Sequence, residues 1–327
     1  MRHPSRLHEL AASFCFALPL WVVPPSTANA QVAPITADTV RTHYRTATID
    51  GVELFYREAG PADGPVVVLL HGFPTSSHMY RNLIPVLADR YHVIAPDYPG
   101  FGQSGVPDRR TFDYTFAHFA TLIDGLLDHL GAKRYALYIQ DYGAPVGLRL
   151  ALLHPERVTA LVAQNGNAYV EGFSDFWKPL QAYWADDTQA RRDALRPGLS
   201  LGATRAKYLD GVRDPSRIDP DNWVHDQALL DRPGIDEIMI DLWKGYATNV
   251  ALYPEFQAFF RARRPPTLIA WGANDPIFPA AGARAYLRDL PDAELHLLDT
   301  GHFALEDQGE EIGRLMHDFL DRKLPRP

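Results

Sequence analysis

Short apolar runs alternate along this chain with longer stretches in which apolar residues recur at helical spacing. The short runs are rich in branched and aromatic residues, which is typical of strands; they span 45–49, 52–58, 66–70, 92–95, 135–139, 158–163, 267–271 and 294–298. The helical stretches span 79–88, 116–130, 144–153 and 310–320. This alternation predicts an α/β fold with a mostly parallel, doubly wound sheet.

The alternation breaks between residues 165 and 252, where helical patterns are joined by turns rich in Pro and Asp. This stretch has no strand-like run, and it holds four of the six tryptophans: Trp177, Trp184, Trp223 and Trp243. We interpret it as a helical cap inserted between two strands. The core then consists of residues 45–164 and 253–323. Most cap aromatics are expected to pack, because Trp and Tyr bury large areas.

The first 30 residues have the layout of a secretory signal peptide. Two arginines precede a mostly apolar run at residues 10–23, and Ala28-Asn29-Ala30 supplies a small-x-small cleavage site. A membrane anchor is the less favoured alternative, because the apolar run is short and ends at Pro24-Pro25. We therefore expect export to the periplasm or the medium, with no stable membrane anchor after cleavage. Residues 31–44 are expected to form a linker.

Composition narrows the chemistry. The chain has 327 residues, 46% of them hydrophobic and 22% charged, and a formal net charge of -8. Its single cysteine, Cys15, lies in the predicted signal peptide, so the mature chain is expected to lack thiol catalysis and thiolate metal sites. The histidines show no metal-ligand spacing. No basic cluster stands out, so we expect no nucleic-acid partner.

Three residues form a candidate catalytic set. Asp141 lies between the predicted strand 135–139 and the predicted helix 144–153, on the kind of sharp turn that presents a nucleophile, with the small Gly143 beside it. Asp275 and His302 follow the last two predicted strands. The chain order nucleophile, acid, His suits a triad. Each acid also has a purely structural alternative: Asp141 as a turn residue and Asp275 as a helix N-cap.

The residues after the strand 66–70 suggest an oxyanion hole. They read His71-Gly72-Phe73-Pro74. The N–H groups of Phe73 and Tyr142 are the expected donors. Pro74 is a candidate for a cis peptide bond.

In these motifs, residues 45–320 resemble the α/β-hydrolase superfamily, in its haloalkane dehalogenase and epoxide hydrolase branch. The resemblance is carried by His-Gly-Phe-Pro (71–74), Asp-Tyr-Pro-Gly-Phe-Gly-Gln-Ser (97–104), Gln-Asp-Tyr-Gly (140–143) and Gly-His-Phe (301–303). It implies a small hydrophobic electrophile and water as reactants, and no cofactor. A carboxylate nucleophile at Asp141 displaces a halide or opens an epoxide and becomes an alkyl ester. His302, supported by Asp275, then activates the water that hydrolyses this ester.

The choice of electrophile stays open at this stage. Many dehalogenase relatives hold the halide with an Asn and a Trp at the positions that are Phe73 and Tyr142 here. Epoxide hydrolases use cap tyrosines as proton donors, and Tyr246 falls where one such tyrosine is expected. Tyr183 and Tyr169 are candidates for the second, and Trp177 is a further candidate to bind substrate. The balance narrowly favours epoxide opening.

Three further alternatives have weaker support. A halo-acid dehalogenase is expected to bind the substrate carboxylate with arginines near the elbow, where Arg149 on the following helix is the candidate. An ester or lactone hydrolase would use Asp141 as a base. A non-catalytic relative would only bind a ligand.

Overall fold

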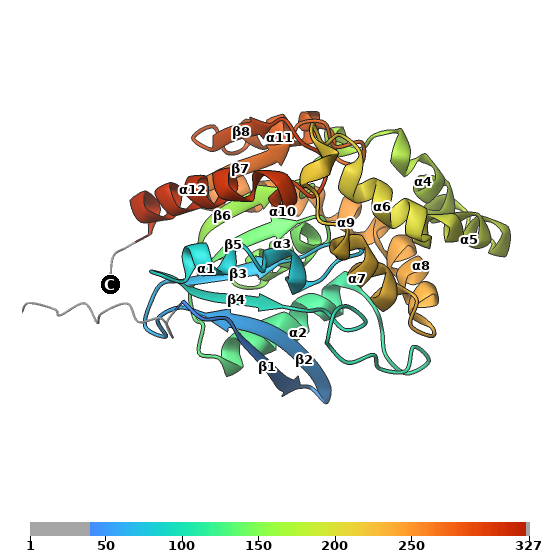
Figure 1. Ribbon diagram of the computed structural model, residues 1–327, viewed down its shortest axis with the longest axis horizontal. Coiled ribbons are helices and arrows are strands. Elements are labelled where there is room, and N and C mark those ends of the chain that lie inside the picture. Colours follow the sequence, from blue (N-terminus) through green and yellow to red (C-terminus); the bar gives the residue numbers. More distant parts are fainter. Residues whose placement is uncertain (1–39, 325–327) are drawn as a thin grey trace, which may run out of the picture. The chain divides into compact units, whose positions relative to one another are not determined.

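The computed structural model describes residues 40–324, so the predicted signal peptide and most of the predicted linker lie outside the described residues. An eight-stranded sheet runs through the described part in the order β1-β2-β4-β3-β5-β6-β7-β8 (Figure 1). Its strands are β1 (His43–Ile49), β2 (Val52–Ala59), β3 (Val66–Leu70), β4 (His92–Pro96), β5 (Tyr135–Gln140), β6 (Val158–Gln164), β7 (Thr267–Gly272) and β8 (Glu294–Leu298). All predicted strands are confirmed, with ends shifted by at most two residues.

The sheet is antiparallel only at one edge. β2 pairs antiparallel with β1 and with β4, and every other pairing is parallel. The predicted α/β fold with a mostly parallel sheet is therefore confirmed. The central strand β5 is buried along its whole length, which is expected where helices cover both faces of a parallel sheet.

Helices form a layer on each face of the sheet. Val68 and Leu70 of β3 pack in the same apolar cluster as α2 (Phe116–His129), α3 (Gly143–Leu153) and α10 (Tyr253–Arg263). Val67 and Leu69 point the other way, because successive strand side chains alternate. They pack in the cluster that contains α1 (Ile84–Leu87) and α12 (Leu305–Lys323). The short helix α11 (Ala280–Ala285) and a 3-10 turn at Tyr286–Arg288 connect β7 to β8.

Two helix predictions were wrong in extent. The helix predicted at 79–88 is a 3-10 turn at Ser77–Tyr80 followed by the four-residue α1. Pro85 lies in the first turn of α1, and because proline has no N–H, the helix cannot run through from the residues before it. The helix predicted at 310–320 instead begins at Leu305, with a non-helical backbone at Gln308. Gly309 next to it weakens the helical pattern in the sequence.

Between β6 and β7 the chain forms helices and turns and contributes no strand to the described sheet. The helices of the predicted cap are α4 (Lys178–Ala185), α5 (Gln189–Leu195), α6 (Leu201–Leu209), α7 (Asp221–Leu230), α8 (Ile235–Gly245) and α9 (Ala247–Ala251). Short 3-10 turns lie at Val170–Gly172, Asp175–Trp177, Arg196–Leu199 and Pro215–Arg217. Figure 1 shows these helices gathered on one side of the sheet.

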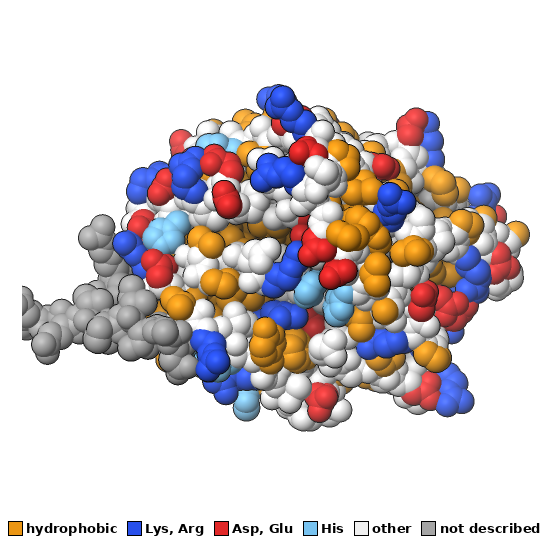
Figure 2. Space-filling view, viewed as in Figure 1, with side chains coloured by type: hydrophobic (Ala, Val, Ile, Leu, Met, Phe, Trp, Pro, Cys, Tyr) orange, Lys and Arg blue, Asp and Glu red, His pale blue; other side chains and the backbone are white. Residues whose placement is uncertain are grey.

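Charged side chains of both signs are interspersed on the face that Figure 2 shows. On this face the two signs of charge are mixed and do not gather into a single-sign patch. Within residues 40–324, every helix is too short or too polar to span a lipid bilayer.

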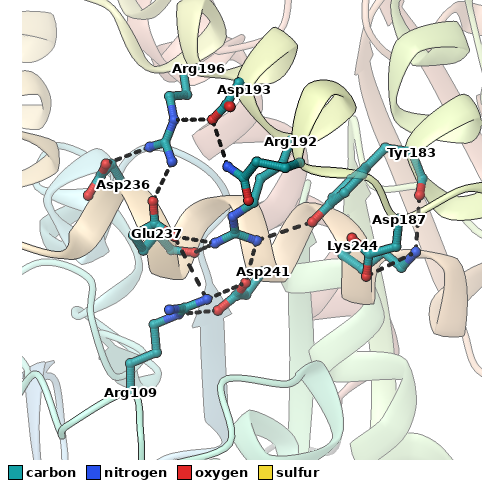
Figure 3. A network of polar contacts seen from close by, with 11 residues as sticks. Arg109, Tyr183, Asp187, Arg192, Asp193, Arg196, Asp236, Glu237, Asp241 and Lys244 are labelled. Carbon is teal, nitrogen blue, oxygen red and sulfur yellow. Dashed lines mark hydrogen bonds and ion pairs between the residues drawn. The ribbon is translucent and has the colours of Figure 1, made fainter.

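An ion-pair network joins two cap helices to the core (Figure 3). Arg192 on α5 pairs with Glu237 and Asp241 on α8. Arg109, from the segment between β4 and α2, also bonds to Asp241. Isolated surface pairs contribute little to stability, but Arg192 is only 12% exposed and holds several partners at once. The network therefore fixes how α5 and α8 lie against the core segment that carries Arg109.

Candidate active site

Asp141 lies on a tight turn between β5 and α3. Its φ is +47°, in the left-handed region that costs a non-glycine residue energy. Two residues on, Gly143 passes so close to β3 that an added Cβ would lie 2.0 Å from the Leu70 carbonyl oxygen. Only glycine fits there, as expected for the strand-to-helix elbow. The strained turn holds the Asp141 side chain above the end of the sheet.

The structure brings Asp141, Asp275 and His302 together. They follow β5, β7 and β8, whose carboxyl ends lie at one edge of the sheet. The Nδ1 atom of His302 is 2.8 Å from Asp275 Oδ2, and its Nε2 atom is 3.9 Å from Asp141 Oδ2. All three residues are at most 5% exposed. His302 thus bonds to one carboxylate and faces the other across a gap.

Asp275 is fixed by two further bonds. Its Oδ1 accepts the Ile277 N–H at 2.7 Å, and its Oδ2 also accepts the side-chain amide of Asn165 at 2.8 Å. The next helix, α11, begins only at Ala280, so Asp275 closes a turn and is not a helix N-cap. Asn165 has a φ of +46°. Its positioning role depends on tertiary contacts with Asp275 and β7, and sequence reasoning did not identify it.

One of the two expected oxyanion donors bonds to the Asp141 carboxylate. The Phe73 N–H donates to Asp141 Oδ1 at 2.7 Å, and the peptide bond before Pro74 is cis, as predicted. The backbone amide of Tyr142 acts to lower the pKa of the same carboxyl group. One carboxylate oxygen is therefore held in the amide cradle, while Oδ2 faces His302.

The electrostatics of the two groups are coupled. Burial raises the pKa of Asp141 above its usual range, although His302 and the two amides act to lower it. Burial acts to lower the pKa of His302, but Asp275 and then Asp141 favour its charged form, and together they raise that pKa. Charge on Asp141 thus supports charge on His302.

An inner cavity of about 20 Å³ lies against these groups. The core side of its wall includes Phe73, Asp141, Tyr142 and His302, and the cap side includes Trp177, Leu180, Lys207 and Trp243. A larger cavity of about 540 Å³ within the cap shares Leu180, Lys207 and Trp243 with it. The inner space is close to the size of one water molecule, and the larger cavity offers room for an organic substrate.

Two of the cap candidates lie next to Asp141. Trp177 lines the inner cavity, with its indole N–H donated to the Ile277 carbonyl at 3.0 Å. Tyr246 is buried behind the wall, with ring centroids 4.6 Å from Trp177 and 6.1 Å from Tyr142. Burial raises its pKa well above 10, so the phenol stays neutral. Tyr246 thus packs behind Tyr142 and is not on the cavity wall.

The side chains of the other candidates, Tyr183, Tyr169 and Arg149, bond to residues away from the two cavities. The Tyr183 hydroxyl accepts a bond from Arg192 at 3.1 Å within the ion-pair network (Figure 3). The Tyr169 hydroxyl donates to Asp289 at 2.8 Å. Arg149 donates to the Pro145 carbonyl and to Thr248. None of these three residues lines either cavity, so the structure does not bring them to Asp141.

Sequence reasoning missed Lys207 and Trp243 as cavity residues. Trp243 was interpreted only as a packing residue of the cap, and a lysine in the polar helix α6 resembles an ordinary surface residue. Only the fold of the cap turns both side chains toward Asp141. No cluster of His, Cys, Asp and Glu suited to a metal ion occurs within residues 40–324.

Comparison with known proteins agrees with this architecture. Residues 65–308 match the family model described as the alpha/beta hydrolase fold. An uncharacterized hydrolase of Saccharomyces cerevisiae is 48% identical over 263 residues, which cover 79% of this chain and 89% of the yeast protein. A haloalkane dehalogenase of Mycobacterium marinum is 42% identical over 280 residues, which cover 80% of this chain and 86% of that protein.

Solved structures give the same picture. A loop variant of a haloalkane dehalogenase from Bradyrhizobium elkanii superposes with a TM-score of 0.66 at 28% identity, over 86% of this chain and 97% of that chain. An epoxide hydrolase of Vigna radiata superposes with a TM-score of 0.68, over 86% of this chain and 98% of that chain. At 22% sequence identity, this superposition shows a shared fold and nothing further.

Proposed function

Because the chain belongs to the α/β-hydrolase fold family and is a hydrolytic enzyme with haloalkane dehalogenases among its relatives, we propose that it attacks saturated carbon with the carboxylate of Asp141. The observation that carries this proposal is the different bonding of the two Asp141 carboxylate oxygens. One oxygen is bonded to the Phe73 amide, and the other is free and faces His302 across 3.9 Å.

The first step is displacement. The free Oδ2 of Asp141 forms a bond to carbon while the bond from that carbon to the epoxide oxygen or halogen breaks. An ionised carboxylate needs no base for this attack. The product is an ester in which Oδ1, still in the amide cradle, is the carbonyl oxygen.

The second step is hydrolysis. His302 Nε2 takes a proton from a water that attacks the ester carbon, while Asp275 holds Nδ1 and stabilises the imidazolium. Oδ1 becomes the oxyanion, the Phe73 amide already donates to it, and the Tyr142 amide is the second donor that we propose. Loss of one such donor typically costs roughly a hundred- to a thousandfold in rate.

Ester formation also prepares the base. Alkylation removes the charge of Asp141, which is one of the groups that raise the pKa of His302. The imidazole therefore loses its proton more readily once the ester exists. The group that must act in the second step becomes a better base as a result of the first.

An epoxide is the electrophile we propose first. The Asn and Trp that hold halide in many dehalogenases are replaced by Phe73 and Tyr142, and both of these line the inner cavity. Burial raises the pKa of Tyr142 well above 10, so its phenol stays neutral and can donate a hydrogen bond to an epoxide oxygen. A leaving alkoxide, unlike a halide, requires such a donor.

A haloalkane is the second candidate, supported by the haloalkane dehalogenase of Mycobacterium marinum at 42% identity. The same carboxylate and base serve both reactions, and only the leaving group differs.

Trapping the ester tests the proposal. His302→Ala removes the base, so the ester on Asp141 accumulates during incubation with epoxides and haloalkanes, and mass spectrometry of the peptide that carries Asp141 detects the added mass. The same peptide from His302→Ala/Asp141→Asn stays unmodified. A folded His302→Ala protein that forms no adduct with a broad panel of both substrates contradicts the covalent mechanism. Ester turnover that survives Asp141→Asn would instead support an esterase.

A further inference from the structure

Lys207 is a buried cation beside the proposed nucleophile. It lies on α6 and is only 8% exposed. Its side chain lines the inner cavity together with Asp141 and His302, and it lines the larger cap cavity as well. A lysine is seldom buried in this way without a charged partner.

The fixed contacts of Lys207 do not neutralise its charge. Its ammonium group donates to the carbonyl oxygens of Ala203 at 3.2 Å and Gly198 at 3.4 Å, and it lies 5.2 Å from the centroid of the Phe73 ring. Within residues 40–324, no carboxylate forms an ion pair with it at 4.0 Å or less. Asp141 is the anion that acts on it electrostatically. The charge of Lys207 is thus balanced by a group that loses its own charge during the proposed reaction.

Burial lowers the pKa of Lys207 to about 8, against the opposing effect of Asp141. The amine is therefore mostly protonated at neutral pH and releases its proton more readily than an exposed lysine does. Both properties suit a group that receives developing negative charge.

We propose that Lys207 is a catalytic residue that stabilises the leaving atom when Asp141 attacks. With an epoxide it protonates the alkoxide as the ring opens, and with a haloalkane it forms an ion pair with the departing halide. This role rests on the covalent function proposed above. It adds to that function a cation that protonates or pairs with the atom leaving carbon, beside the hydrogen bond proposed from Tyr142, whereas Asp275 and His302 act on the water.

The proton balance closes for an epoxide. The bond from carbon to the epoxide oxygen breaks with its electron pair on oxygen, which takes a proton from Lys207 and becomes a hydroxyl. In hydrolysis, one proton of the water passes through His302 to the second alcohol. The other leaves the regenerated Asp141 carboxyl and restores the Lys207 ammonium. For a halide, the electron pair leaves with the halogen and Lys207 keeps its proton.

Lys244 is a control that separates a structural role of Lys207 from a catalytic one. Lys244 on α8 also donates to two carbonyl oxygens, those of Tyr183 at 3.0 Å and Trp184 at 3.3 Å, and lies 5.1 Å from the centroid of an aromatic ring. Lys244 does not line either cavity. Lys207→Met and Lys244→Met both remove two hydrogen bonds to carbonyl oxygens and a contact with an aromatic ring. Lys244→Met also removes an ion pair with Asp187, and only Lys207→Met removes a cation beside Asp141.

The test measures ester formation alone, by the rate of adduct growth on Asp141 in the His302→Ala protein. Adding Lys207→Met is expected to slow this rate with epoxides about a hundredfold, the usual contribution of a general acid. Lys244→Met leaves it unchanged. Lys207→Arg keeps the cation but is a poor proton donor, so it restores the rate with haloalkanes and not with epoxides.

A second measurement needs no change at Lys207. In the His302→Ala protein, ester formation from epoxides is expected to decline above about pH 8, where Lys207 loses its proton. The other ionisable groups near Lys207 are Asp141, Tyr142 and Asp210, and Lys207→Met should remove this decline while leaving them in place. Equal adduct rates with and without Lys207→Met, or a flat profile above pH 8, overturn the role of Lys207 alone. A His302→Ala protein without any adduct overturns the covalent function itself.

Discussion

The imidazole of His302 is 2.8 Å from Asp275 but 3.9 Å from Asp141, so the base is bonded to its supporting acid and separated from the proposed nucleophile. In a serine hydrolase the His must reach the nucleophile to remove its proton. A carboxylate has no proton to remove at working pH. In the proposed mechanism, the gap leaves room beside His302 Nε2 for the water that hydrolyses the ester, and the side-chain amide of Gln140 lies 3.1 Å from the same atom.

This arrangement predicts a coupling that can be measured in the resting enzyme. Asp141→Asn should lower the pKa of His302, because the asparagine no longer stabilises the imidazolium across 3.9 Å. Asp275→Asn should lower it further, since the contact with Asp275 is shorter. NMR titration of the His302 ring measures both shifts. An unchanged pKa in Asp141→Asn would refute the coupling.

The close approach of α3 to β3 predicts that the elbow tolerates no side chain at residue 143. Gly143→Ala places a Cβ 2.0 Å from the Leu70 carbonyl oxygen and should lower the free energy of unfolding by at least about 3 kcal/mol. Gly245→Ala is the control, because nothing lies within 4 Å of its added Cβ on α8. That variant should gain about 0.5 kcal/mol. Urea unfolding compares the two, and similar stabilities would contradict the clash.

The ion-pair network predicts a minor catalytic role for Tyr183. Its hydroxyl accepts from Arg192 rather than facing Asp141, so Tyr183→Phe should change kcat/KM by no more than about threefold while costing about 1 kcal/mol of stability through the lost hydrogen bond. Turnover and urea unfolding of the same preparation test this. A loss of kcat/KM by a hundredfold would show that the hydroxyl acts on the substrate.

The buried carboxyl group of Asp226 should make the free energy of unfolding depend on pH. This carboxyl is buried in α7, bonded to the Tyr208 hydroxyl, and burial raises its pKa to about 7. Between about pH 4 and 7 the folded chain therefore binds a proton that the unfolded chain releases, so this group makes stability fall as pH rises. Asp226→Asn removes the ionisation and should be more stable than the native chain at pH 8, on the order of 4 kcal/mol.

The stability difference should become small near pH 4, where Asp226 is protonated in the folded chain and about half protonated in the unfolded chain. Urea unfolding at the two pH values measures it, and an equal effect at pH 4 and pH 8 would contradict the raised pKa.

The sequence was sufficient wherever a local pattern carries the information. Strand periodicity placed the eight strands, and the residues that end them placed Asp141, Asp275 and His302 at one edge of a parallel sheet. These predictions rest on short-range rules: apolar runs form buried strands, and residues at strand ends face a common edge. Pro74 and Gly143 could also be singled out from the local sequence, because only X-Pro bonds readily become cis and only glycine lacks a Cβ. The contact with Leu70 that requires Gly143 came from the tertiary structure.

The cap required the tertiary structure. Its helices carry Tyr, Trp, Lys and Arg on several faces, and the sequence does not fix which face turns toward Asp141. The fold directs Lys207 and Trp243 to the cavity, while Arg192 holds the hydroxyl of Tyr183 away from it. Asn165 likewise acquires its partner Asp275 only across 110 residues of chain. Thus the sequence by itself determined the sheet and the position of the proposed nucleophile Asp141, because both follow from local patterns. Only the packing of distant segments decided which cap side chains surround that carboxylate, because side-chain direction depends on what each helix packs against.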